Sequence, residues 1–324
     1  MGAWLRMLAF LDGRSVVPLY VGTALLSMAT PLSLNGISVI ANLWFPDGQR
    51  ATATALMGLS QPLGILVGLG ITGVLAAGLD TEDPAACFDT VRSVTLAQNA
   101  VVSVLSLLVF ILFREKPTYP PSKMALVRRV LTGAGLSDDF AVLRKNWNYL
   151  GNAWIFSVFE GTFFAIGNLL SPLFGATYTA TEISLLGAAF VTCGVLATGL
   201  AGVLIDRTGA FLGAIRAISI VGAGCLLSAQ WVIPYGNFYI TLALCAIMGA
   251  GLCPILPAGY SLSVFLTHPI PPAVSNGFLM CCAQAFSVIS VLVGGRLLAI
   301  SFYYGCTYFC VLAVTAVVVA FCMR

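Results

Sequence analysis

The chain has 324 residues, of which 59% are hydrophobic and 8% are charged, and its formal net charge is +3. Its mean hydropathy is +0.99. A soluble domain carries about 25% charged residues because its surface faces water, so this composition excludes a large soluble core. The small net charge and the lack of a basic stripe exclude nucleic-acid binding. The class that remains is an all-α polytopic membrane protein.

Apolar stretches long enough to cross a hydrocarbon layer of ~30 Å recur along nearly the whole chain. The N-terminal stretch carries Arg6, Asp12 and Arg14 and has no small-residue cleavage site, so it does not resemble a signal peptide. Pro254 and Pro257 predict a kink in one of the later spans. We predict a partial span at residues 1–11 and nine full spans at about 16–44, 52–78, 94–113, 147–171, 183–204, 211–233, 238–264, 275–300 and 303–322.

The longest polar insert, residues 114–146, divides the spans into two groups. It holds seven of the fifteen basic residues, which places it in the cytoplasm by the positive-inside rule. Alternation from this point puts the acidic loop 79–89 outside. The predicted organisation is therefore a partial N-terminal helical half (residues 1–113, the end of helix 3 and helices 4–6), a cytoplasmic linker (114–146) and a C-terminal six-helix half (147–324, helices 7–12).

Residue types that carry catalysis or bind metals are scarce. His268 is the only histidine, no CxxC pair occurs, and most of the ten cysteines fall within or at the ends of spans, where they are small apolar side chains. No GxxxxGK[ST] phosphate-binding loop is present. The sequence therefore predicts no cofactor, no metal site and no enzyme.

One carboxylate lies inside a span. Glu160 is near the middle of the run "WIFSVFEGTFFAIGNLL", where an ionised Glu costs at least ~2.5 kcal/mol unless it faces water or a partner. Four-residue spacing places Glu160, Phe164 and Asn168 on one helix face. An acid beside an aromatic ring could hold an organic cation, and an acid that gains and loses a proton could couple transport to protons. The remaining alternative is a protonated structural Glu bonded to a neighbouring helix.

The segment "GVLIDRTG", residues 202–209, closes one predicted span and precedes the next. It resembles the G-x-L-x-D-R-x-G loop of the major facilitator superfamily, which lies between the second and third helices of a half. The resemblance implies a conformational gate in which Gly202 permits close helix approach, Asp206 meets a helix N-terminus, Arg207 bridges to it, and Gly209 ends the motif. The alternative is an ordinary polar turn with an Asp–Arg pair.

Further stretches resemble the FLVCR-related family of that superfamily, which is linked to haem, choline and ethanolamine transport. They are "GAWLR" (2–6), "LWFPDGQRATATA" (43–55), "SQPLGILVG" (60–68), "REKPTYPPS" (114–122), "LLGAAFVTCGVLATGLAGVLIDRTGAF" (185–211) and "SNGFLMCCAQAF" (275–286). The resemblance covers essentially the whole chain. It implies that residues 1–11 are the end of the third helix, and that the first two helices and most of the third are missing.

The resemblance also implies binding residues. Gln61 and Gln284 stand where the family has substrate-facing glutamines, and Phe164 stands where members that bind choline have a tyrosine. A buried amide needs a partner or a wet cavity, so helix–helix hydrogen bonding is the alternative for both glutamines. With Glu160 and Asn168, these residues form the predicted substrate site.

The expected function is secondary-active or facilitative transport of a small organic solute by alternating access. The expected solute is an organic cation such as choline or ethanolamine, or haem. The expected surroundings are a lipid bilayer, of the plasma membrane or an organelle, with possible proton coupling and an oligomeric state left open. The alternative is a truncated, non-transporting chain that acts as an interaction partner or is inert.

Overall fold

The computed structural model describes residues 2–12, 16–45, 57–58, 60–78, 84–114, 136–267 and 270–323. Within these ranges every regular element is helical and no strand occurs, which confirms the predicted all-α fold. The helices are α1 (Gly2–Asp12), α2 (Val17–Trp44), α4 (Ser60–Gly78), α5 (Pro84–Leu112), α7 (Leu136–Leu143), α8 (Trp147–Asn168), α9 (Leu170–Phe174), α10 (Ala180–Thr208), α11 (Phe211–Val232), the 3₁₀ turn η2 (Ile233–Tyr235), α12 (Phe238–Leu252), α13 (Ile255–Thr267), α14 (Pro272–Ile300) and α15 (Phe302–Cys322).

Six helical segments in the described part of the chain are long and apolar enough to cross a membrane, which confirms a multi-pass protein. They are Ala85–Leu112, Ala180–Ile205, Phe211–Tyr235, Phe238–Thr267, Pro272–Ile300 and Phe302–Cys322. The predicted spans 16–44, 52–78 and 147–171 correspond to the helices α2, α4 and α8, which are outside this set. The count of nine spans stays a prediction.

The chain divides into two compact units, which are described separately below. The first unit contains residues 1–54 and 78–132, and the second contains residues 55–77 and 133–324. The predicted division at residues 113 and 146 stays a prediction. The short helix α7 lies inside the predicted linker, and residues 115–135 lie outside the described residues.

The first unit packs α1 against α2 and α5. Two polar contacts fix α5 on α1: the Asn99 side-chain amide donates to the Ala3 carbonyl oxygen at 2.9 Å, and the Trp4 indole N–H donates to the Ser103 hydroxyl at 2.9 Å. The Asn99 side chain is buried in α5, one of the six segments able to cross a membrane, so its bond satisfies a polar group that lipid could not.

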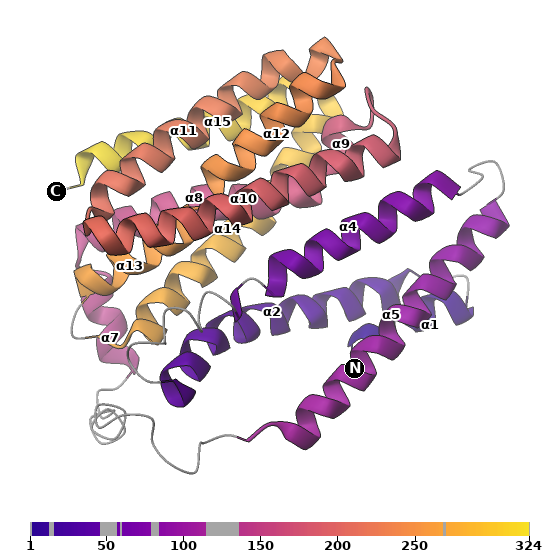
Figure 1. Ribbon diagram of the computed structural model, residues 1–324, viewed down its shortest axis with the longest axis horizontal. Coiled ribbons are helices and arrows are strands. Elements are labelled where there is room, and N and C mark those ends of the chain that lie inside the picture. The colour runs from indigo at the N-terminus through magenta and orange to yellow at the C-terminus, as the bar shows by residue number, and fades with distance from the viewer. Residues whose placement is uncertain are drawn as a thin grey trace. The chain divides into compact units, whose positions relative to one another are not determined.

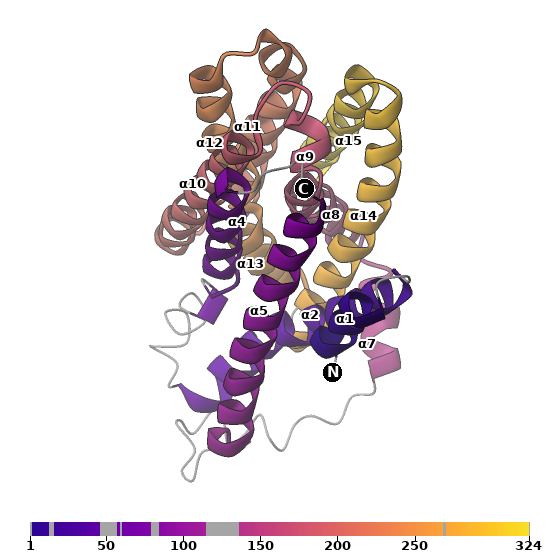
Figure 2. The same cartoon turned by 90° about the vertical axis from the view of Figure 1, so that its right-hand side faces the viewer.

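The second unit is a bundle of long helices arranged around α8 (Figures 1 and 2). α8 contacts α14, α13, α15, α12 and α11. It begins at Asn146, whose side-chain oxygen accepts from the Tyr149 backbone N–H at 3.1 Å. The same side chain donates to the Leu266 carbonyl oxygen at 3.0 Å, so one residue caps α8 and ties it to α13.

The predicted span 238–264 is two helices, α12 and α13, separated at Cys253 and Pro254. Proline has no backbone N–H, so the Ala250 carbonyl oxygen loses its α-helical donor at this point. The Leu256 N–H donates to the Cys253 carbonyl oxygen at 3.2 Å, which is a tighter turn than an α-helix. The kink predicted from Pro254 is confirmed.

The helices α10 and α12 approach each other closely in the second unit. A side chain at Gly249 of α12 would collide with the Phe190 carbonyl oxygen of α10. Only glycine permits this spacing. The contact fixes the position of Phe190, which matters for the cavity described next.

Candidate functional site

A cavity of about 170 Å³ lies within the second unit, between α4, α8, α9 and α10. Its walls are mostly apolar, and a single amide side chain provides polarity. The lining residues are Ile65, Leu69, Phe163, Phe164, Gly167, Asn168, Leu170, Phe190 and Val191. Small-molecule sites commonly have this composition, an apolar wall with few polar groups.

Three phenylalanines form one side of the cavity. Phe163 stacks on Phe190 with ring centroids 4.8 Å apart, and Phe164 meets Phe163 edge-on at 5.7 Å. Phe164 is half-buried, so part of its ring faces the open space. An aromatic face of this kind attracts an organic cation.

Asn168 supplies the polar group. Its side-chain nitrogen donates to the Phe164 carbonyl oxygen at 2.8 Å, which holds the side chain against its own helix. No described contact uses its side-chain oxygen, which can therefore accept a hydrogen bond from a solute. Asn168 and Phe164, two of the five predicted binding residues, line the same cavity.

The two glutamines lie elsewhere. Gln61 is half-buried on α4, and four-residue spacing places it on the face that carries Ile65 and Leu69 into the cavity. Gln284 is half-buried on α14, where its amide nitrogen is 4.0 Å from the Met280 sulfur. Neither glutamine is among the lining residues, and their roles stay predictions.

Glu160 is buried, with 4% of its surface exposed, and it does not line the cavity. It lies one turn before Phe164 on α8, as its spacing predicts. Its oxygen Oε2 has no hydrogen-bond partner among the described residues. The structure therefore separates the buried acid from the aromatic cavity. The role of Glu160 in binding a solute or a proton stays a prediction.

The predicted gate forms the end of α10 and the turn that follows. Gly209 adopts a left-handed conformation with φ of 63° and its N–H donates to the Ile205 carbonyl oxygen, so the glycine ends the helix. Arg207 is exposed in the last turn, where a cation interacts favourably with the helix dipole. Gly202 is half-buried with open space beside its Cα, and the Asp206 side chain lies outside the described residues. The gate itself stays a prediction.

Several cavity residues were not predicted from the sequence, above all Phe163 and Phe190. Phe163 adjoins Phe164, but a helix turns by about 100° per residue, so adjacency indicates no shared function. Phe190 comes from another helix, and no spacing within α10 indicates that it meets α8. The "GAAF" stretch around it lies within a segment that resembles the FLVCR-related family, and this resemblance assigns Phe190 no role.

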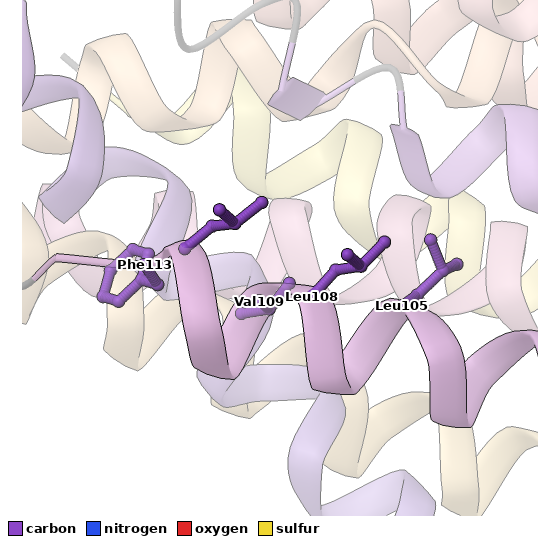
Figure 3. A pocket seen from close by; sticks show the side chains of 5 residues that line it. Leu105, Leu108, Val109 and Phe113 are labelled. Atoms are coloured by element: carbon purple, nitrogen blue, oxygen red, sulfur yellow. The ribbon is translucent and has the colours of Figure 1, made fainter.

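A second hollow lies on α5, in the first unit (Figure 3). Its volume is about 340 Å³, and all its lining residues are apolar and come from the end of α5 and the residue after it: Leu105, Leu108, Val109, Leu112 and Phe113. These side chains are exposed. Such a surface suits lipid acyl chains and offers no group that could orient a polar solute.

Comparisons with known proteins give the similarities of this chain at the level of family and fold. Residues 1–179 match the sequence model of the family described as Major Facilitator Superfamily. The chain is 26% identical over 302 residues to the human choline/ethanolamine transporter FLVCR2, covering 92% of this chain and 57% of the relative. It is 24% identical over 302 residues to the cat choline/ethanolamine transporter FLVCR1, covering 92% and 53%. It is also 25% identical over 289 residues to solute carrier family 49 member A3 of Xenopus tropicalis, covering 86% and 56%. The chain thus spans little more than half the length of these relatives.

Solved structures show the same fold. A point variant of the E. coli fucose:proton symporter FucP superposes with a TM-score of 0.64 at 13% identity, covering 100% of this chain and 80% of that one. A bacterial homologue of the human lysosomal transporter Spinster, inward-facing and unoccupied, gives a TM-score of 0.63 at 14% identity, covering 99% and 78%. At these identities the likeness concerns the fold alone.

Proposed function

This chain belongs to the Major Facilitator Superfamily, and from that premise we propose that it carries a small organic solute across a membrane by alternating access. The observation that supports the proposal most is the aromatic cavity at the end of α8, which combines ring faces with one amide. Such a site binds and releases a solute without covalent chemistry.

The proposed solute is an organic cation such as choline or ethanolamine. Phe164 offers a ring face for the ammonium group, and Asn168 offers an oxygen for the hydroxyl group of either alcohol. The names of the relatives FLVCR1 and FLVCR2 point to the same solutes. Haem fits less well, because a cavity of about 170 Å³ is smaller than the roughly 300–1,000 Å³ of sites for drug-sized ligands.

The other predicted residues have secondary roles in this proposal. Gln61 would turn toward the solute from α4 when the site opens, since it already shares a face with Ile65 and Leu69. Gln284 would approach from α14. The α10–α11 turn that holds Arg207 and Gly209 would act as the gate between the two access states.

The test is uptake by the purified full chain in liposomes, with labelled choline, ethanolamine and haem offered separately. Phe164→Leu removes the ring, and a cation–π contact contributes about 0.5 to 2 kcal/mol, so apparent affinity for choline should fall roughly twofold to thirtyfold. Phe164→Tyr keeps the ring and should retain uptake.

Phe278→Leu is the matched control. Phe278 is a half-buried ring of the second unit that packs on Phe140 and Tyr149 and does not line the cavity. Equal losses of choline affinity in Phe164→Leu and Phe278→Leu would contradict the site. Absence of uptake for all three solutes would favour the alternative, a non-transporting chain that acts through protein contacts.

A further inference from the structure

The buried acid Glu160 faces a different part of the bundle from the cavity. Asn152 and Phe156 precede it at four-residue intervals on the same face of α8. The Asn152 side-chain nitrogen donates to the Gly259 carbonyl oxygen of α13 at 3.0 Å, and Phe156 stacks on Tyr260 of α13 at 5.4 Å. This face of α8 is therefore directed at α13 as far as Glu160, and only the following turn reaches the cavity.

The other faces of α8 at this level meet apolar groups. Gly161 packs against Ala283 and Phe286 of α14, and Phe159 packs against Gly222 of α11. Among the described residues, no lysine or arginine forms an ion pair with Glu160, and no second carboxylate interacts with it. The acid is thus buried without a compensating charge.

The titratable groups that interact with Glu160 come from two places, the break between α12 and α13 (Cys253) and α13 itself (Tyr260). Tyr260 and Cys253 both lie close enough to interact electrostatically with its carboxyl group. The Thr198 hydroxyl of α10 contacts Cys253. Gly194 of α10 has no side chain, which leaves room for the Cys253 sulfur 3.3 Å from the place where a Cβ of residue 194 would lie. The acid therefore has a hydroxyl and a thiol group as its titratable neighbours, and the thiol lies where the helical backbone is interrupted.

Two more unsatisfied polar atoms lie nearer the start of α8, with the ring of Phe156 between them and Glu160 along the helix. The Asn152 side-chain oxygen and the Ser263 hydroxyl are buried without hydrogen-bond partners among the described residues. Ser263 is four residues after Gly259, so it shares the face of α13 that binds Asn152. Asn146 at the N-terminal end of α8 and Thr267 at the C-terminal end of α13 are further polar residues on this side. We call Asn146, Asn152, Ser263 and Thr267 together the polar seam. Buried polar atoms of this kind are where ordered water binds.

We propose that Glu160 is a proton-binding site, separate from the solute cavity, whose protonation sets the packing of α8 on the α12–α13 break. A hydronium ion that enters along the seam of Asn152 and Ser263 gives its proton to the carboxylate, which leaves a neutral acid and one water molecule. The neutral acid is compatible with the closed packing seen here. The carboxylate requires water, which favours an arrangement in which the seam opens.

A proton fits this site better than a metal cation. Sodium or calcium requires several oxygen ligands, and Glu160 is the single carboxylate among the groups that surround it. A proton requires one lone pair, and the unpartnered oxygen Oε2 provides it. The coupling of this proton to solute movement rests on the proposed transport function, whereas proton binding itself does not.

Infrared difference spectroscopy of the purified full chain tests proton binding without any solute. Titration from acidic to basic pH should remove the carbonyl stretch of a buried carboxylic acid in the native protein and in Glu182→Gln. Glu160→Gln should lack that band. Glu182 is a suitable control because it belongs to the Thr179 capping box of α10, where Gln serves equally well.

A band that persists in Glu160→Gln, or a Glu160 carboxyl that never changes protonation in the range where the protein stays folded, would overturn the proposal. The second outcome would identify Glu160 as a structural acid. A sodium-dependent loss of the band at constant pH would also overturn it in favour of a cation site.

Coupling is measured separately, in liposomes with equal choline on both sides and the membrane potential clamped. One unit of pH gradient should drive up to about a tenfold change in choline distribution in the native chain and in Glu182→Gln. Glu160→Gln should exchange choline and ignore the gradient. If the native chain exchanges choline but no pH gradient moves it, coupling fails while the proposed transport stands. If no solute exchanges at all, the transport proposal fails, and the infrared result still decides proton binding.

Discussion

The helices α8 and α5 are both apolar, yet they are packed in opposite ways. α8 has 22 residues, and its buried set includes Asn152, Ser157, Glu160 and Thr162. α5 has 29 residues, and among its side chains that the structure describes, residues 85–112, only Thr95 and Asn99 are buried. The most apolar part of α5 is its most exposed part, with Phe110 88% exposed.

The difference shows which residues direct packing in a membrane. Lipid solvates apolar side chains as well as the protein interior does, so hydrophobicity does not pull a span inward. Polar groups do, because lipid cannot satisfy them. Even α5 obeys this rule, since its packed face carries Thr95, Asn99 and Ser103 at four-residue intervals, and the last two bond to α1.

The largest effect on this comparison should come from truncating a ring in each helix. Phe156 is fully buried and stacks on Tyr260, so Phe156→Ala should destabilise the second unit by about 3–5 kcal/mol. Phe110→Ala on α5 should change the unfolding free energy by less than about 0.5 kcal/mol. Thermal unfolding in detergent measures both, and equal losses would refute the contrast.

A smaller effect should come from adding a methyl group where α8 meets α14. At Gly161 a Cβ would lie 2.7 Å from the Phe286 ring and 2.9 Å from the Ala283 carbonyl oxygen, so Gly161→Ala should cost about 1–3 kcal/mol. Gly224 of α11 has open space at this position. Gly224→Ala should be neutral or stabilise by up to about 1 kcal/mol through helix propensity. A stabilising Gly161→Ala in the same unfolding assay would contradict the packing of α8.

The smallest effect should be common to both helices. Asn99 of α5 and Asn152 of α8 each donate one hydrogen bond to a neighbouring helix, so replacement by Ala should cost about 0.6–1.7 kcal/mol in either case. Asn168→Ala is the control, since that side chain bonds only within α8 among the described contacts. A cost at Asn99 close to zero, measured by unfolding, would mean that polar residues do not direct the packing of α5.

The sequence predicts the helices well because each needs only local information. Length and apolarity are sufficient for α11 and α15, whose ends fall within one residue of their predicted bounds. The break at Pro254 follows from a missing N–H, which is also local. Charge distribution and motifs are sufficient to indicate the family.

The site is less predictable, because a helix face can meet different neighbours along its length. Spacing predicts Glu160, Phe164 and Asn168 on one face of α8, and of these three only Phe164 and Asn168 line the cavity. That face meets α13 at Glu160 and the cavity at Phe164, a change that depends on where α4, α10 and α13 lie. Phe190 enters the cavity because Gly249 lets α12 approach its backbone, and no pattern within α10 contains that information.

If the end of α8 lines the site where the solute binds, a bound solute should shield residue 168 from chemical labelling. An Asn168→Cys variant in membranes would be labelled with a maleimide at increasing choline concentration, and each cysteine would be followed by peptide mass spectrometry. We expect choline to slow labelling at position 168 and to leave labelling of the exposed native Cys322 unchanged. If choline has no effect on labelling at position 168 in a protein that still transports choline, the solute does not bind at the end of α8.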